Sequence, residues 1–164
     1  MKSRILFYVK IFLILAIVST LIFTFYQSAQ PMEKSAEISE NFGEIIEPII
    51  PSDTPVGSYV HDNLRKIAHF FEFFALGAEV CLYVSLFLRQ RNFIVASLLA
   101  APFTALFDET IQVFSARGAS VVDIWIDIGG YATAAALIYF ASLIVLSVKK
   151  RKGERILKNG DIDG

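Results

Sequence analysis

The side chains most able to do chemistry lie in two short stretches of an otherwise apolar chain. The first stretch places a cation, an imidazole and a carboxyl at helical spacing, in Lys66, His69 and Glu72. The second stretch carries a longer set of polar residues: Asp108, Glu109, Gln112, Arg117, Ser120, Asp123 and Asp127. An imidazole beside carboxylates can accept and return a proton near neutral pH. We therefore interpret His69, Asp108 and Glu109 as candidate catalytic residues and the other members as candidate substrate-binding residues.

The same residues could bind a divalent cation. Their ligand atoms are mostly oxygens, from His69, Glu72, Asp108, Glu109 and Asp123. Such a set suits calcium, magnesium or manganese better than zinc, which usually has more nitrogen or sulfur ligands. Unless a cation is bound, we expect at least one of the crowded carboxyls to be protonated near neutral pH. No Ser or Cys nucleophile has an obvious base partner, so we predict no catalytic triad, and an enzymatic activity stays an open alternative.

The composition is typical of an integral membrane protein. Of the 164 residues, 55% are hydrophobic and 15 are Phe, and the mean hydropathy is +0.56. A soluble domain of this size would need a more polar surface. The net charge of -1 provides no excess of positive charge for nucleic acid. We therefore expect membrane lipids, and not nucleic acid, as partners.

Four apolar segments are each long enough to cross a bilayer as a helix: residues 5–26, 66–88, 93–114 and 121–148. Lys and Arg residues gather before the first segment, between the second and third segments, and in the tail 149–164. If the helices alternate in direction, these three regions lie on one side, which the positive-inside rule identifies as the cytoplasm. We predict an all-α, four-helix membrane bundle that forms one domain over residues 1–164, with both termini in the cytoplasm.

The segment 27–64 is acidic and is expected to lie outside the cytoplasm. It contains Lys34 as its only Lys or Arg, against the acids Glu33, Glu37, Glu40, Glu44, Glu47, Asp53 and Asp62. Its apolar residues recur at helical spacing, at Ile38, Phe42, Ile45 and Ile49. The pattern ends at Pro48 and Pro51. This pattern predicts an amphipathic helix over residues 38–49 on the outer membrane surface, which either packs there or covers the bundle as a lid.

The two polar stretches are expected to meet near the outer membrane surface. The second and fourth spans begin outside and the third ends outside, so their polar residues reach one depth. Asp123, Asp127 and Gly130 share one face of the fourth span, where small residues allow close helix packing. A carboxylate that faces lipid near mid-span costs roughly 2.5 to 3.5 kcal/mol. We therefore expect the carboxyls to face the bundle interior, with Glu79 extending their row toward mid-membrane.

Some other side chains have simpler interpretations. Cys81 is the only cysteine, so no internal disulfide can form, and its apolar neighbours predict a packing role. Four aromatic residues near the outer boundary are predicted to anchor the chain at the membrane interface: Tyr26, Tyr59, Trp125 and Tyr131.

The combined motif resembles the VanZ-like family of bacterial membrane proteins over roughly residues 20–140. The resemblance rests on Arg65-Lys66-x-x-His69 with Glu72, on Asp108-Glu109-x-x-Gln112 followed by Arg117, and on Ser120-x-x-Asp123 with Gly129 or Gly130. Asp127 departs from the Asn expected there and makes the cluster more negative. The resemblance implies a cell-envelope protein of the bacterial cytoplasmic membrane. It also implies a link to teicoplanin, a glycopeptide antibiotic that acts on cell-wall precursors outside that membrane.

Three functions are compatible with these observations. The first is a site that binds or acts on an envelope lipid or an anionic or lipid-linked precursor, with Arg65, Lys66 and Arg117 able to hold phosphate. The second is a structural polar network that fixes helix packing in a membrane scaffold. The third is a cation or proton pathway that continues through Glu79, although four helices are few for a transporter.

Overall fold

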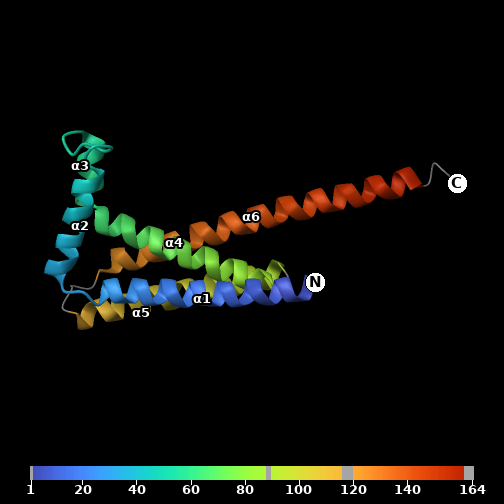
Figure 1. The fold of residues 1–164 in the computed structure, drawn as a ribbon, viewed down its shortest axis with the longest axis horizontal. Coiled ribbons are helices and arrows are strands. Elements are labelled where there is room, and N and C mark those ends of the chain that lie inside the picture. Colours follow the sequence, from blue (N-terminus) through green and yellow to red (C-terminus); the bar gives the residue numbers. More distant parts are fainter. Residues whose placement is uncertain (1, 88–89, 116–119, 161–164) are drawn as a thin grey trace.

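The computed structural model describes residues 2–87, 90–115 and 120–160 (Figure 1). Within these ranges the chain consists of helices and turns without any strand, which confirms the predicted all-α class. The helices are α1 (Lys2–Ser28), α2 (Met32–Ile46), α3 (Pro55–Asp62), α4 (Leu64–Ser85), α5 (Gln90–Phe114) and α6 (Val121–Gly160).

The four long helices pack along one another, with α4 in the centre. Helix α4 contacts α1, α5 and α6, and α5 contacts both α1 and α6. The start of α1 and the end of α6 lie at the end of the molecule away from α2 and α3, as Figure 1 shows. This arrangement brings the start of α4, the end of α5 and the start of α6 to the same end of the protein.

Three described helices are long and apolar enough to cross a membrane. These segments are Ser3–Ser28 in α1, Leu64–Ser85 in α4 and Val121–Val148 in α6. Many of their large apolar side chains are exposed, as expected for surfaces that contact lipid. The third predicted span corresponds to α5, and its crossing of the membrane stays a prediction, as does the cytoplasmic position of the termini.

Helices α4 and α6 approach each other closely through two glycines. A Cβ atom on Gly130 would lie 2.2 Å from the Phe70 carbonyl oxygen, and one on Gly77 would lie 2.9 Å from Tyr131 Cα. A side chain at either position would therefore collide with the backbone of the other helix. The small-residue face predicted for the fourth span is thus the surface that packs on α4, with Gly130 rather than Gly129 at the contact.

Buried side chains beside this contact form the apolar core. The core includes Phe73, Leu76 and Cys81 of α4 and Tyr131 of α6, each at most 1% exposed. The predicted packing role of Cys81 is confirmed. The prediction that Tyr131 anchors at the membrane interface is wrong, because its ring is completely buried in the core.

Helix α2 crosses the end of the molecule where α4 and α6 begin (Figure 1). It starts at Met32, earlier than the predicted residue 38, because Pro31 precedes a first turn that contains Glu33 and favours helix formation. It ends at Ile46, two positions before Pro48. The predicted bounds 38–49 are therefore corrected to Met32–Ile46.

The two faces of α2 differ in polarity. Ser35 and Gly43 are buried against the protein, whereas Phe42 and Ile45 are 53% and 70% exposed. This outward apolar face is what a helix lying on a membrane surface requires.

Helix α6 continues beyond its apolar segment. The predicted span 121–148 coincides with the membrane-compatible part of α6, but the helix runs without a break to Gly160. Most of the predicted tail 149–164 is therefore helical in the part that the structure describes.

Candidate functional site

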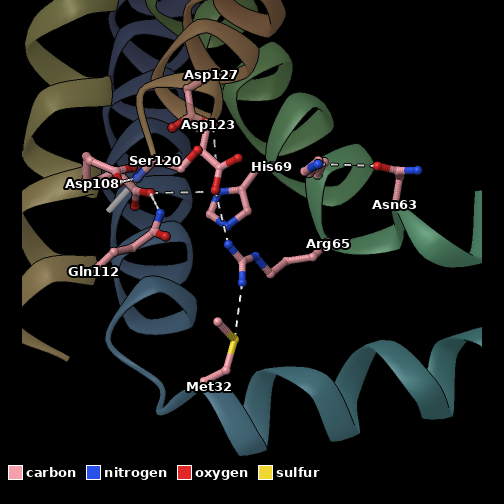
Figure 2. Close-up of polar contacts among 11 residues, drawn as sticks. Met32, Asn63, Arg65, His69, Asp108, Gln112, Ser120, Asp123 and Asp127 are labelled. Atoms are coloured by element: carbon pink, nitrogen blue, oxygen red, sulfur yellow. Dashed lines mark hydrogen bonds and ion pairs between the residues drawn. The ribbon is translucent and has the colours of Figure 1, made fainter. Parts of the chain in front are cut away.

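A buried polar cluster lies where α4, α5 and α6 meet, next to the start of α2 (Figure 2). Asp108, Gln112 and Asp127 are 0% exposed, and His69, Glu109 and Asp123 are each 6% exposed. His69 lies near the start of α4, Asp108 and Gln112 lie near the end of α5, and Asp123 and Asp127 lie near the start of α6. The helical spacing noted in the sequence places these residues on inward faces, as expected for polar side chains in a membrane protein.

His69 lies at the centre of the cluster, between two carboxylates from different helices. Its Nδ1 atom is 3.7 Å from Asp108 Oδ2 and 3.7 Å from Asp127 Oδ1. Gln112 lies one turn from Asp108 on α5 and donates a hydrogen bond from Nε2 to Asp108 Oδ2 at 2.8 Å. The amide thus fixes the position of one of the two carboxylates that face the imidazole.

Arg65 closes the side of the cluster nearest α2. Its Nη2 donates to Asp123 Oδ2 at 3.1 Å, and its Nη1 lies 3.4 Å from Met32 Sδ on α2 (Figure 2). Asp123 belongs to the first turn of α6, where the positive end of the helix dipole also favours a carboxylate. Arg65 therefore links α2, α4 and α6 at one point.

Glu109 links the end of α5 to the beginning of α6. Its Oε1 atom accepts a hydrogen bond from the backbone N–H of Ser120, the residue just before α6. A backbone donor at the start of a helix is a natural partner for a carboxylate. Among the described residues, Glu109 and Asp123 thus each have a donor, one from the backbone and one from a side chain.

Two predicted residues lie elsewhere, and one cannot be placed. Lys66 is exposed, and its Nζ lies 3.4 Å from Asn63 Oδ1, away from the buried cluster. Glu72 is half-buried one turn from His69 on α4. Arg117 lies outside the described residues. The structure therefore brings together His69, Asp108, Glu109, Gln112, Asp123 and Asp127, with the backbone of Ser120.

Arg65 takes the position that the sequence interpretation gave to Lys66. Both cations precede His69 on the same helix, but Arg65 lies four residues before His69 and seven before Glu72. These spacings place it closer to the inward face than Lys66, which is six residues from Glu72. The spacing to His69 and Glu72 could therefore have identified Arg65, rather than Lys66, as the cation on the inward face of the helix.

Two hollows adjoin the cluster and share Ala68 and Glu72. The first is a cavity of about 60 Å³ between α1, α2 and α4, lined by Gln27, Ser35, Ile38, Ser39, Arg65, Ala68, His69 and Glu72. The second is an open groove of about 490 Å³ between α1 and α4, lined by Ser19, Thr20, Phe23, Ala68, Phe71, Glu72 and Ala75. A polar cavity beside His69 is therefore adjacent to a largely apolar groove between two membrane-compatible helices.

Glu79 is held separately, deeper along α4. Its Oε1 accepts a hydrogen bond from the Thr20 hydroxyl of α1 at 3.0 Å. This contact gives one carboxylate oxygen a donor and ties α1 to α4, whereas the buried Oε2 has no hydrogen-bond partner among the described residues.

The sequence comparison identifies the family. The VanZ/LLP1 family model matches residues 11–144, a range that contains every residue of the cluster. The chain therefore belongs to the VanZ/LLP1 family, in agreement with the resemblance of its motifs. Neither the curated proteins nor the solved structures contain a match. Membership supports a VanZ-like membrane protein of the cell envelope.

Proposed function

We propose that this protein binds the head group of an envelope lipid or lipid-linked precursor in the outer leaflet of the bacterial cytoplasmic membrane. Helices α1, α4, α5 and α6 cross the membrane, both termini are cytoplasmic, and α2 and α3 lie on the outer surface. Binding at the buried cluster changes the susceptibility of the cell to glycopeptides of the teicoplanin type. Family membership supports the envelope location, and the shape of the site supports the lipid.

One observation carries this proposal: Glu72 and Ala68 line both the polar cavity and the apolar groove. A lipid needs an apolar surface for its acyl chains and, directly beside it, polar partners for its head group. The groove offers Phe71 and Phe23, which are 62% and 53% exposed, and the cavity offers Arg65 and His69. The adjacent hollows match the two parts of such an amphiphile.

The cationic residues of the site would hold a phosphate-bearing head group. Arg65 already projects a guanidinium into the cavity region, and charge-assisted hydrogen bonds from arginine suit phosphate oxygens. The exposed Lys66 is a candidate for further contacts, and Arg117, which lies outside the described residues, stays a candidate from the sequence alone. Glu72, Gln112, Ser120, Asp123 and Asp127 would then orient these groups. If a reaction follows binding, His69 with Asp108 or Glu109 is the candidate proton acceptor.

The outer wall of the cavity is provided by α2. Ser35, Ile38 and Ser39 form this wall, and about 60 Å³ admits only a small polar group. A complete head group therefore requires α2 to move away from α4, in keeping with its proposed role as a lid. The connection between α2 and the cluster through Met32 and Arg65 would break in that movement.

The cluster is tested by single substitutions in a host that needs this protein for teicoplanin tolerance. His69→Gln and Glu109→Gln should each lower tolerance while the membrane abundance of the protein stays normal, and Arg65→Gln should lower tolerance by more than any fall in its abundance. Lys34→Gln removes an exposed cation from α2 and serves as the matched control for charge. Normal tolerance in all three variants at normal abundance would reject the proposal.

The groove is tested separately by filling it. Ala75→Trp places a large ring in the groove, whereas Leu99→Trp places the same ring on the outward face of α5, where Leu99 is 58% exposed. We expect Ala75→Trp to reduce both tolerance and the lipid that co-purifies with the protein in mild detergent. Equal lipid content in the two variants would contradict a lipid in the groove.

The structural alternative is favoured by the contacts within the cluster. Arg65 joins α4 to α6, and Glu109 joins α5 to the start of α6, so both residues also support packing. Under this alternative, loss of tolerance appears only together with loss of protein from the membrane. The parallel abundance measurement therefore separates a binding site from a purely structural network.

A further inference from the structure

His69, Asp108 and Asp127 surround one small volume in the interior of the protein. The three side chains come from α4, α5 and α6, all are buried, and each offers one ligand atom within 4.8 Å of the other two. The distance from His69 Nδ1 to either carboxylate oxygen is 3.7 Å, too long for a hydrogen bond. Two ligands on one metal ion typically lie about 3 to 4 Å apart, as the usual metal–ligand lengths imply.

Asp127 has an unusual environment for a buried carboxyl. It is 0% exposed, and among the described residues neither of its oxygens has a hydrogen-bond partner. Asp108 Oδ1 likewise has no hydrogen-bond partner there. A buried carboxylate without a partner is strongly unfavourable, so these oxygens require a cation or a proton.

The neighbouring acids of the cluster each have at least one donor, which Asp127 lacks among the described residues. Asp123 receives Arg65, and Glu109 receives the backbone N–H of Ser120. A network built only for packing would be expected to supply donors to all of its members. Asp108 and Glu109 each have one oxygen without a hydrogen-bond donor, whereas Asp127, which faces the imidazole, has none for either oxygen among the described residues.

The charge balance favours the same conclusion. Within the described residues the cluster contains four buried carboxyls, those of Asp108, Glu109, Asp123 and Asp127. Arg65 is the cation paired with one of them, and His69 adds a charge only if it is protonated. A divalent cation between Asp108 and Asp127 would remove most of the remaining repulsion.

We propose that His69, Asp108 and Asp127 bind one divalent cation. The two carboxylates are oxygen ligands of the kind that Mg²⁺ and Ca²⁺ prefer, and the imidazole nitrogen is a common ligand of transition metals. Mn²⁺ is a transition metal that also binds carboxylates, so it is the most suitable probe. The hydrogen bond from Gln112 holds the Asp108 carboxylate in place, as supporting residues commonly do for metal ligands. The cation site does not depend on the proposed lipid function.

The first experiment measures the metal content of protein purified in detergent without a chelator. Elemental analysis should find about one divalent ion per chain, or Mn²⁺ should raise the unfolding temperature of chelator-treated protein. Asp108→Asn and Asp127→Asn should abolish both signals. Glu79→Gln, which removes a carboxyl that accepts from Thr20 elsewhere on α4, should retain them.

A second experiment avoids substitutions inside the cluster. The chain contains two histidines, His61 and His69. In a His61→Gln variant, coupling between bound Mn²⁺ and a histidine nitrogen, measured by pulsed electron paramagnetic resonance, must arise from His69. This measurement also excludes the exposed acidic cleft between α2 and α3, which Glu40, Glu44, Glu47 and His61 line, as the binding place.

Three results would overturn the site. The first is wild-type protein that contains no divalent ion and whose unfolding temperature does not change with Mn²⁺, Mg²⁺, Ca²⁺ or Zn²⁺. The second is Mn²⁺ bound by the His61→Gln variant without histidine coupling. The third is full metal retention in folded Asp108→Asn and Asp127→Asn proteins.

Discussion

Arg65 of α4 and Asp123 of α6 form an ion pair in which the guanidinium Nη2 lies 3.1 Å from the carboxylate Oδ2. The side chains are unequally accessible, at 27% for Arg65 and 9% for Asp123. Loss of the arginine would therefore leave the more buried charge without its partner. Removal of Arg65 is therefore expected to cost more stability than removal of Asp123.

Arg65→Gln should destabilise the protein more than Asp123→Asn. Breaking a fully buried pair costs roughly 3 to 5 kcal/mol, and the partial exposure of Arg65 lowers our expectation to about 2 kcal/mol. For Asp123→Asn we expect about 1 kcal/mol, because the arginine can turn toward solvent. Thermal unfolding in detergent measures both. The double variant should regain part of the loss, and strictly additive losses would contradict the coupling.

Gly130→Ala should destabilise the α4–α6 contact, whereas Gly129→Ala should not. The new methyl group at position 130 would meet the Phe70 carbonyl, but nothing lies within 4 Å of the corresponding position at Gly129. We expect a loss of about 1 to 3 kcal/mol for the first and a gain of up to about 1 kcal/mol for the second, from helix propensity. Comparison of unfolding midpoints for this adjacent pair checks the prediction, and similar midpoints would show that the helices tolerate separation.

Gln112→Leu should lower stability through Asp108. The amide of Gln112 donates to Asp108 Oδ2, and its removal leaves the buried carboxylate without that donor. We expect a loss of about 1 to 3 kcal/mol, and a larger loss for Gln112→Glu, which adds a like charge. Thr110→Val is the control, because its exposed hydroxyl donates within α5 to the Leu106 carbonyl. An equal effect of the Gln112→Leu and Thr110→Val changes would count against the role of the amide.

The α2–α3 connection should loosen in acid. The backbone N–H and hydroxyl of Ser52 donate to Glu47 and, with smaller help from His61, hold the Glu47 pKa below its usual value. A lowered folded-state pKa means that the contribution to stability is present above the unfolded-state pKa, about 4.3. It is then lost as the pH falls through the folded-state value.

Limited proteolysis of residues 47–62 at pH 7 and below pH 4, with an acid-active protease calibrated on a peptide, measures this effect. Glu47→Gln should already be cleaved faster at pH 7 and should respond less to acid. An unchanged acid response in Glu47→Gln would assign the effect to other groups.

The proposed topology can be tested by single cysteines, because Cys81 is the only native one and is fully buried. Tyr59→Cys on α3 should react with a membrane-impermeant maleimide in intact cells. Arg151→Cys on α6 should react only after the cells are opened, since the positive-inside rule places this end in the cytoplasm. The opposite pattern would invert the orientation and move the cluster to the cytoplasmic side.

Much of the site could be predicted from helical periodicity. Asp108 and Gln112 are four residues apart, as are Asp123 and Asp127, so each pair shares a face, and the burial cost of carboxyls turns those faces inward. The position of Gly130 on the packing face was predicted from its spacing after Asp123 and Asp127, but its contact with the Phe70 carbonyl was not, because that contact depends on the exact rotation of α6 against α4. Tyr131 was misassigned from its residue type, although it follows Asp127 by four residues and therefore shares the buried face.

The contact between Gly130 and the Phe70 carbonyl limits how the cluster can open. It lies three residues from Asp127 on α6 and one residue from His69 on α4, so backbone touches backbone at the depth of the cluster. Sliding or parting of α4 and α6 would disrupt that contact, and the distance between His69 and Asp127 is therefore held by main-chain packing. Thr20 and Met32, by comparison, join α1 and α2 to α4 through side chains. Under the proposed lipid function, entry from the bilayer would therefore proceed by displacement of α1 and α2, while α4 and α6 remain in contact.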